Sequence, residues 1–268
     1  MINIFIYFLI FFIGILFGNM FNMFGNVLSN KHNKNYIYTN CKNCNYKLKF
    51  TDISLISYIF NLGRCKNCKK KISFFPSVIE IMTGLLFLIC YIKYNNSEEQ
   101  ILYLIYSLSF ISSLIMIIVS DIKYMIIPDQ IIIVFTIIMS IIKLLIGYSN
   151  EEIKTILDLG YEILFLFYDG FFMFLIMYGL KSLGDFLCKR DSMGGGDVKL
   201  MFYISLVLGW RISIVILFLA AFIALPVSIV KMIRKKEVML PFGPYIAIST
   251  LIIFLFKIDF NTVLDYIL

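Results

Sequence analysis

Eight apolar runs fill most of this sequence of 268 residues, and most are about as long as a helix that crosses a membrane. A bilayer core of about 30 Å is crossed by roughly 20 apolar residues in helical conformation. The sequence is 60% hydrophobic and 15% charged, which lies outside the range of ordinary soluble domains. It therefore predicts an all-α polytopic membrane protein with about eight transmembrane helices. The expected spans are residues 3–21, 74–92, 101–120, 126–147, 160–180, 196–210, 212–230 and 243–258.

The cations fall mainly on one side of this predicted topology. If the N-terminus lies outside, 19 of the 24 Lys and Arg residues lie in cytoplasmic loops, and five lie on the other side. This excess predicts a multi-pass protein of the cytoplasmic membrane. The net charge of +7 then reflects topology and anionic lipid, and it does not indicate a nucleic-acid partner. The loops assigned to the cytosol are residues 22–72, 121–125, 181–199 and 231–242.

Two cysteine pairs lie in the one sizeable polar segment, residues 31–72. Cys41 and Cys44 form the first Cys-x-x-Cys pair, and Cys65 and Cys68 form the second. Four thiolates at this spacing are typical of a zinc ribbon, in which they close a tetrahedral site. Disulfides are the alternative, but a cytoplasmic loop lies in a reducing compartment. Because the segment holds few large apolar residues, we expect it to need Zn²⁺ to keep its shape.

Two aspartates stand at the ends of predicted membrane helices. Asp121 ends the run 101–120, and Asp197 opens the run 196–210. An acidic residue at the edge of a membrane helix is a candidate functional residue because it is costly to place there. Two carboxyls that meet at low dielectric share a proton, so that one activates water while the other stays protonated. That is the chemistry of an aspartic protease.

The glycines Gly194, Gly195 and Gly196 precede Asp197 directly. We expect them to allow close approach of a substrate or helix and to adopt the backbone angles of a sharp turn. Only thirteen residues separate Asp197 from Arg211, which corresponds to about 20 Å of helix. This helix is too short for the bilayer, so the sequence predicts a water-filled notch at the cytoplasmic face.

Four further residues are candidates for active-site support. Pro128 predicts a bend and the start of a helix, with Asp129 in its first turn as a capping or supporting acid. Lys199 either stabilises the neighbouring carboxylate or reaches lipid phosphate. Glu80 either has a substrate or structural role, or is a solvated residue or a partner of the lysines at 69–71.

Taken together, these motifs resemble those of the type IV prepilin peptidases, the GxGD-type aspartic membrane proteases of peptidase family A24. The resemblance rests on Asp121 with Pro128-Asp129, on the segment 194–199 and on Pro241-Phe-Gly-Pro244. The cysteine pairs followed by Pro76-Ser-Val-Ile-Glu80 extend it, so that it spans about residues 18–245.

The resemblance implies that Asp121 and Asp197 are catalytic and that type IV prepilins or pseudopilins are the substrates. Cleavage would remove a short basic leader on the cytosolic side. Larger members of the family also methylate the new N-terminus with S-adenosylmethionine, and the cysteine segment accompanies that activity. Methylation is therefore expected here as well.

Two other functions remain open from the residues alone. Intramembrane acids, including Asp169 in the fifth span, also suit a proton- or cation-coupled transporter. A non-catalytic protein of pilus assembly is the other alternative. In each case the chain divides into a first helix with an interfacial segment (1–30), the cysteine segment (31–72) and a helical membrane core (73–268).

Overall fold

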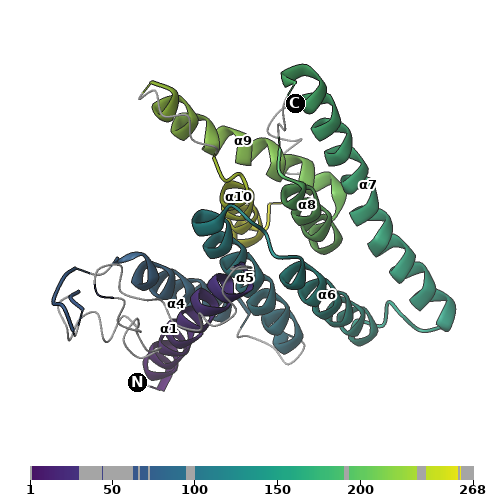
Figure 1. Cartoon of the computed structure of the whole chain (residues 1–268). Coiled ribbons are helices and arrows are strands. Elements are labelled where there is room, and N and C mark those ends of the chain that lie inside the picture. The colour runs from purple at the N-terminus through teal and green to yellow at the C-terminus, as the bar shows by residue number, and fades with distance from the viewer. Residues whose placement is uncertain are drawn as a thin grey trace. The chain divides into compact units, whose positions relative to one another are not determined.

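The computed structural model describes residues 2–29, 44, 63–65, 67–71, 73–94, 100–189, 193–233, 240–258 and 260. These described residues form eight α-helices, and each corresponds to one of the predicted runs (Figure 1). The helices are α1 (Ile2–Ser29), α4 (Phe75–Tyr94), α5 (Gln100–Tyr124), α6 (Asp129–Ser149), α7 (Ile156–Cys188), α8 (Gly195–Leu208), α9 (Trp210–Ile233) and α10 (Gly243–Phe256). The prediction of an all-α polytopic membrane protein is thus confirmed.

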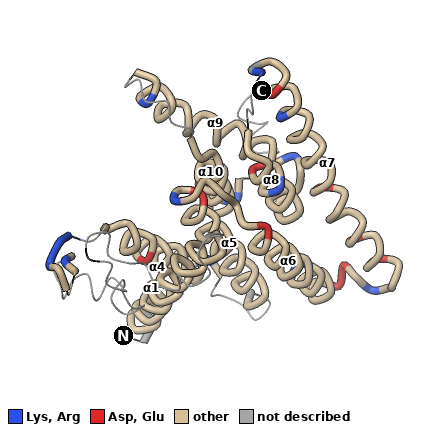
Figure 2. Tube along the Cα trace, in the orientation of Figure 1, with Lys and Arg blue, Asp and Glu red and all other residues tan. Residues whose placement is uncertain are grey.

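Six of the helices in the described part of the chain are long and apolar enough to cross a membrane. The other two, α8 and α10, have only 14 residues each. Charged residues are sparse along all of them (Figure 2). The predicted shortness of the helix that carries Asp197 is therefore confirmed.

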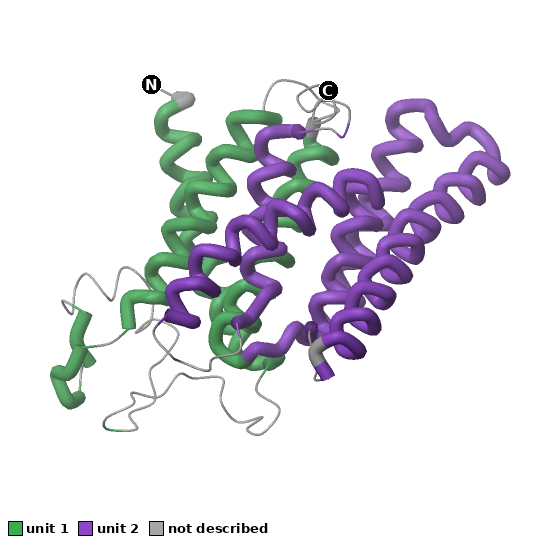
Figure 3. The backbone as a smooth tube through the Cα atoms, turned by 90° about the horizontal axis from the view of Figure 1, so that it is seen from above, with its two compact units in different colours: residues 1–124 green, residues 125–268 purple. Residues whose placement is uncertain are grey.

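The chain forms two compact units, Met1–Tyr124 and Met125–Leu268 (Figure 3). Helices α1, α4 and α5 pack against one another in the first unit, and α6 to α10 pack in the second. These units are defined by backbone packing, whereas the predicted division at residues 30 and 72 is defined by the polarity and cysteine pairs of the segment between them. The three-segment division therefore stays a prediction.

In the first unit, α1 is longer than predicted and runs through residues 22–29 as helix. Its polar residues recur every three or four positions, lie on one face and are no more than 7% exposed. They are Asn19, Asn22, Asn26 and Ser29. Lys123 on α5 donates to Asn26 Oδ1 at 2.8 Å, and Ser29 Oγ lies 2.5 Å from Ser120 Oγ. The prediction of a loop from residue 22 onward is wrong for residues 22–29, because Asn26 and Ser29 bond α5 and Asn22 is buried.

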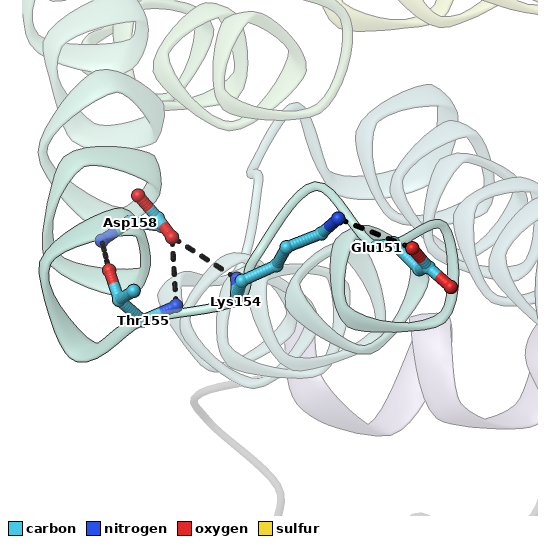
Figure 4. Close-up of polar contacts among 4 residues, drawn as sticks. All are labelled: Glu151, Lys154, Thr155 and Asp158. Atoms are coloured by element: carbon cyan, nitrogen blue, oxygen red, sulfur yellow. Dashed lines mark hydrogen bonds and ion pairs between the residues drawn. The ribbon is translucent and has the colours of Figure 1, made fainter.

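In the second unit, α7 begins with a capping box (Figure 4). Thr155 Oγ1 accepts a hydrogen bond from the Asp158 N–H at 3.2 Å, and Asp158 Oδ2 accepts one from the Thr155 N–H at 2.8 Å. Because this reciprocal pair satisfies two backbone donors, it sets the helix start firmly, four residues before the predicted span. The same turn carries an exposed ion pair between Lys154 and Glu151, with 3.2 Å between Nζ and Oε2.

The far end of α7 also departs from the sequence prediction. Residues 181–193 were expected to be a polar connector, but the helix continues to Cys188, and Lys189 ends it with a left-handed φ of 52°. Apolar residues continue through this stretch, and no proline interrupts it. At 33 residues α7 is about 50 Å long, so it exceeds the thickness of a bilayer core.

Candidate active site and metal site

Asp121 lies in the last turn of α5 and is 5% exposed. The residues before it in α5 form part of the core of the first unit; Val119 and Ser120 are 0% exposed. One residue after the helix ends, Met125 takes a left-handed φ of 51° and turns the chain. The hydrogen bond from Lys123 to Asn26 ties this turn of α5 to α1. The first unit therefore fixes the backbone that carries Asp121.

Asp197 occupies the third position of α8 and is 7% exposed. Its N–H donates to Gly194 O at 3.1 Å, which closes the first turn. Gly194 has an ordinary φ of −67°, so the expectation that this glycine supplies an unusual turn conformation is wrong. The glycines differ instead in the space around them: a Cβ on Gly196 would lie 3.1 Å from Ile127 Cβ, whereas a Cβ on Gly195 would meet nothing within 4 Å.

The N-termini of α6 and α8 are joined by an ion pair. Pro128 precedes α6 in extended conformation, as its predicted bend requires, and Asp129 opens the helix. Lys199 Nζ lies 2.7 Å from Asp129 Oδ1, a partner that sequence reasoning did not consider for this lysine. Both side chains are at least half exposed, so the pair stabilises the unit by only about 0–1 kcal/mol. The pair marks where the starts of these two helices lie side by side.

Glu80 is fully buried, at 0% exposure, in the second turn of α4. The alternative that it is a solvated interfacial residue is therefore wrong. Gly18 of α1 packs closely against it, since a Cβ there would lie 2.8 Å from Glu80 Cα. The close contact of α1 with α4 encloses this carboxyl within the first unit.

Sequence reasoning missed one functional candidate, Lys143. It counted this lysine among the cations at the outer surface, but the residue lies within α6 and donates to the Leu206 carbonyl at 3.3 Å. Asp169 on α7 is 6% exposed, interacts electrostatically with Lys143, and places Oδ2 3.6 Å from where a Cβ on Gly209 would stand. The sequence signal that could have identified Lys143 is the presence of a lysine inside an apolar run.

Three of the four predicted zinc ligands lie together in the described residues. The sulfur atoms of Cys44, Cys65 and Cys68 are all within 4.8 Å of one another, and those of Cys44 and Cys65 are 3.9 Å apart. Zn–S bonds of about 2.3 Å in a tetrahedron place sulfur atoms roughly 3.8 Å apart, whereas a disulfide requires about 2.05 Å. The cluster thus fits a metal and does not fit a disulfide. Cys41 lies outside the described residues.

A tight backbone turn shapes the second cysteine pair. The Cys65 N–H donates to Lys70 O at 2.8 Å, and the Lys69 N–H donates to Cys65 O at 2.9 Å. Lys69 takes a left-handed φ of 55°, and Arg64 pairs with Lys71 in an isolated antiparallel bridge. This turn brings the two thiols together from positions three residues apart.

Long apolar helices with buried acidic residues define a multi-pass α-helical membrane protein, and a cysteine cluster that fits a metal accompanies them. The model of the type IV leader peptidase family matches residues 108–229, and that of the bacterial peptidase A24 N-terminal domain matches residues 12–94. The chain belongs to the type IV leader peptidase family and is a membrane peptidase.

Several curated relatives bear the name prepilin leader peptidase/N-methyltransferase. The protein of Bacillus subtilis (strain 168) is 29% identical, and the match covers 76% of this chain and 75% of the relative. The Dichelobacter nodosus protein is 25% identical, with coverages of 84% and 73%, and the Vibrio cholerae protein is 26% identical, with 80% and 79%. No solved structure matches the chain significantly. The transporter alternative finds no support in these comparisons.

Proposed function

We propose that this protein removes the leader peptide from type IV prepilins or pseudopilins, with Asp121 and Asp197 as its catalytic residues. The observation that carries the proposal is the burial of two acids, each in the terminal turn of a membrane-embedded helix, in a member of the leader peptidase family. The names of the curated relatives support the choice of substrate.

The two carboxyl groups divide the acid and base roles of peptide hydrolysis. The ionised one removes a proton from water, and the resulting hydroxide attacks the scissile carbonyl carbon. The protonated one donates its proton to the carbonyl oxygen. When the tetrahedral intermediate collapses, the C–N bond breaks and the amine takes up a proton. No covalent bond to the enzyme forms, and the two acids titrate as a pair.

The protein works in the cytoplasmic membrane with its active site facing the cytosol. The excess of Lys and Arg in the predicted cytoplasmic loops supports this orientation. A prepilin held by its apolar helix in the bilayer would then offer the cytoplasmic end of that helix at the depth of the two acids. The short α8 suits this arrangement because its 14 residues do not span the bilayer core and so leave its Asp197 end within reach of the cytoplasmic face.

The cysteine cluster holds a structural Zn²⁺ ion, with Cys41, Cys44, Cys65 and Cys68 as the four ligands. The 3.9 Å distance between the sulfur atoms of Cys44 and Cys65 supports this choice. A site closed by four thiolates leaves no open position for water, so the metal stabilises the segment and takes no part in peptide hydrolysis.

The same protein transfers a methyl group from S-adenosylmethionine to the N-terminus that cleavage creates. The support for this second activity comes from the names of the relatives and from the presence of the cysteine segment. The new amine attacks the methyl carbon of the donor, the bond from carbon to sulfur breaks, and a proton leaves the nitrogen.

One mass spectrum tests both activities. Membranes that contain the protein are incubated with a prepilin and S-adenosylmethionine, and the intact mass of the pilin is measured. We expect loss of the leader together with the mass of one added methyl group. An unchanged precursor would contradict the peptidase, whereas a cleaved but unmethylated product would contradict only the transferase.

The glycines before Asp197 give a matched pair of variants. Gly196→Ala is expected to lower cleavage at least about tenfold, because its Cβ would push against Ile127 and displace Asp197. Gly195→Ala is the control, since a Cβ there meets open space. Initial rates of leader removal measure the difference. Equal rates for both variants would show that the space at Gly196 is not needed.

A further inference from the structure

Helices α8 and α9 of the second unit are joined by one residue, Gly209, which creates a backbone break. Gly209 has a φ of 91°, a conformation that side chains other than glycine rarely adopt. The Gly209 N–H donates to Ser205 O at 2.7 Å and ends α8. Its carbonyl accepts from the Ser213 N–H at 3.2 Å and so begins α9. One glycine therefore serves as the C-cap of one helix and the first acceptor of the next.

This break packs against α7 at a level far from either end of that long helix. Ser205 Oγ donates to the backbone carbonyl of Asp169 at 2.8 Å. Thirteen residues of α7 precede Asp169 and nineteen follow it, or about 20 Å and 28 Å of helix. The break therefore lies within the bilayer core. Water cannot hydrogen-bond there to the last carbonyls of α8 or the first N–H groups of α9, which have no partner within their own helix.

Two buried or half-buried charges meet these orphan groups, one at each helix end. Lys143 Nζ on α6 donates to Leu206 O, a carbonyl in the last turn of α8, at 3.3 Å. The Asp169 carboxylate on α7 lies at the start of α9: its Oδ2 would be 3.6 Å from a Cβ on Gly209, the residue just before Trp210, which is the first residue of α9. A cation therefore stands at a helix C-terminus and an anion at a helix N-terminus, which is the favourable arrangement at both.

We infer that Asp169 and Lys143 are positioning residues that cap the two helix ends at the break and so hold α8 at its depth in the membrane. α8 is too short to be anchored by lipid at both ends, and Asp197 stands at its other end, about 20 Å away. Loss of a cap would let α8 shift along its axis and carry Asp197 away from the working position. The consequence for cleavage rests on the proposed catalytic role of Asp197.

The two acids of α7 that interact electrostatically with Lys143 provide the matched variants. Asp169→Leu removes both the charge and the acceptor oxygens beside the start of α9, and Asp169→Asn keeps an acceptor oxygen. Glu162→Gln is the control: this exposed acid also interacts with Lys143 but is not assigned to either helix end. We expect Asp169→Leu to lower kcat for leader cleavage about tenfold, the size of a partly buried charge at a helix end, with KM nearly unchanged. The kcat of Asp169→Asn should lie between those of Asp169→Leu and the parent, and the kcat of Glu162→Gln should equal that of the parent.

A double exchange separates capping from a simple ion pair. If Asp169 and Lys143 only attract each other, Asp169→Lys combined with Lys143→Asp restores activity. If they cap helix ends, the exchange places each charge at the wrong helix end and is at least as harmful as either single change. Restored activity in the double variant would therefore overturn the inference.

A second readout does not depend on catalysis. Gly195→Cys is introduced at the exposed start of α8, and its reaction with a membrane-impermeant maleimide is followed by peptide mass spectrometry. We expect Asp169→Leu to change the labelling rate of this cysteine and Glu162→Gln to leave it unchanged. If the labelling rate changes in Asp169→Leu but neither the parent nor any variant cleaves prepilin, the proposed function is refuted. The capping role is still supported in that case. Unchanged labelling and unchanged kcat in both Asp169 variants would overturn the capping.

Discussion

Asp197→Asn is expected to lower kcat for leader cleavage by about 10²–10⁴-fold, the usual size of a lost acid or base. Asparagine keeps the shape of the side chain but cannot exchange a proton with water. Asp121→Asn should cause a loss of similar size, because the proposed mechanism uses one carboxyl as base and the other as acid. Under the proposed mechanism both carboxyls act on one water molecule, so the double variant should be little worse than either single variant.

The control for this pair is Asp158→Asn at the start of α7. Asp158 is an exposed carboxylate whose hydrogen bonds serve the capping box. The Asp158→Asn variant is expected to cleave prepilin at the parental rate, although the substitution weakens the start of α7 by roughly 1 kcal/mol. Initial rates and the amount of folded protein in the membrane are measured together. Full processing by either Asp121→Asn or Asp197→Asn would refute the catalytic assignment.

Cys65→Ser is expected to abolish zinc binding, with a fall from about one zinc ion per chain to none. Cys65 is 1% exposed, and its sulfur lies near two other thiols of the cluster. A hydroxyl is a poor ligand beside three thiolates, and a structural zinc site contributes about 10–16 kcal/mol to the folding of such a segment. We therefore also expect rapid proteolysis within residues 31–72 of this variant.

Cys90→Ser provides the matched control for the metal. Cys90 is also buried, at 0% exposure, but it lies in α4, and the cysteine cluster does not include it. Its serine variant should keep the full zinc content and the parental resistance to protease. Metal analysis of the purified proteins measures the number of zinc ions per chain in the two variants and the parent. Zinc content that is the same in Cys65→Ser as in the parent would contradict the proposed site.

The fold was largely predictable because membrane helices leave a simple signal in sequence. A run of about 20 apolar residues must form a helix that satisfies its own backbone in the bilayer, and all eight predicted runs appear as helices. The errors lie at the ends of the runs, as in α1 and α7. Polarity was used there as a sign of water, yet Asn22 and Asn26 are buried against neighbouring helices.

The candidate site was predictable only as a set of residue types. Motif spacing singled out Asp197 and the two cysteine pairs, because acids at membrane helix ends and paired thiolates have few other uses. It did not predict the partner of Lys199, which lies seventy positions away at Asp129. It favoured a structural role over a catalytic one for Asp169 but did not identify the groups that this acid serves.

The sequence by itself determined the class of this protein, the eight apolar runs that form helices in the described part of the chain, and the shortness of the helix that carries Asp197. These properties depend on composition and local spacing, which the bilayer converts directly into helices. Only the tertiary structure decided which charge serves which helix end. The hydrogen bond of Lys143 to Leu206 and the placement of the Asp169 carboxylate beside Gly209 join residues far apart in the chain, and such contacts arise only when separate helices pack together.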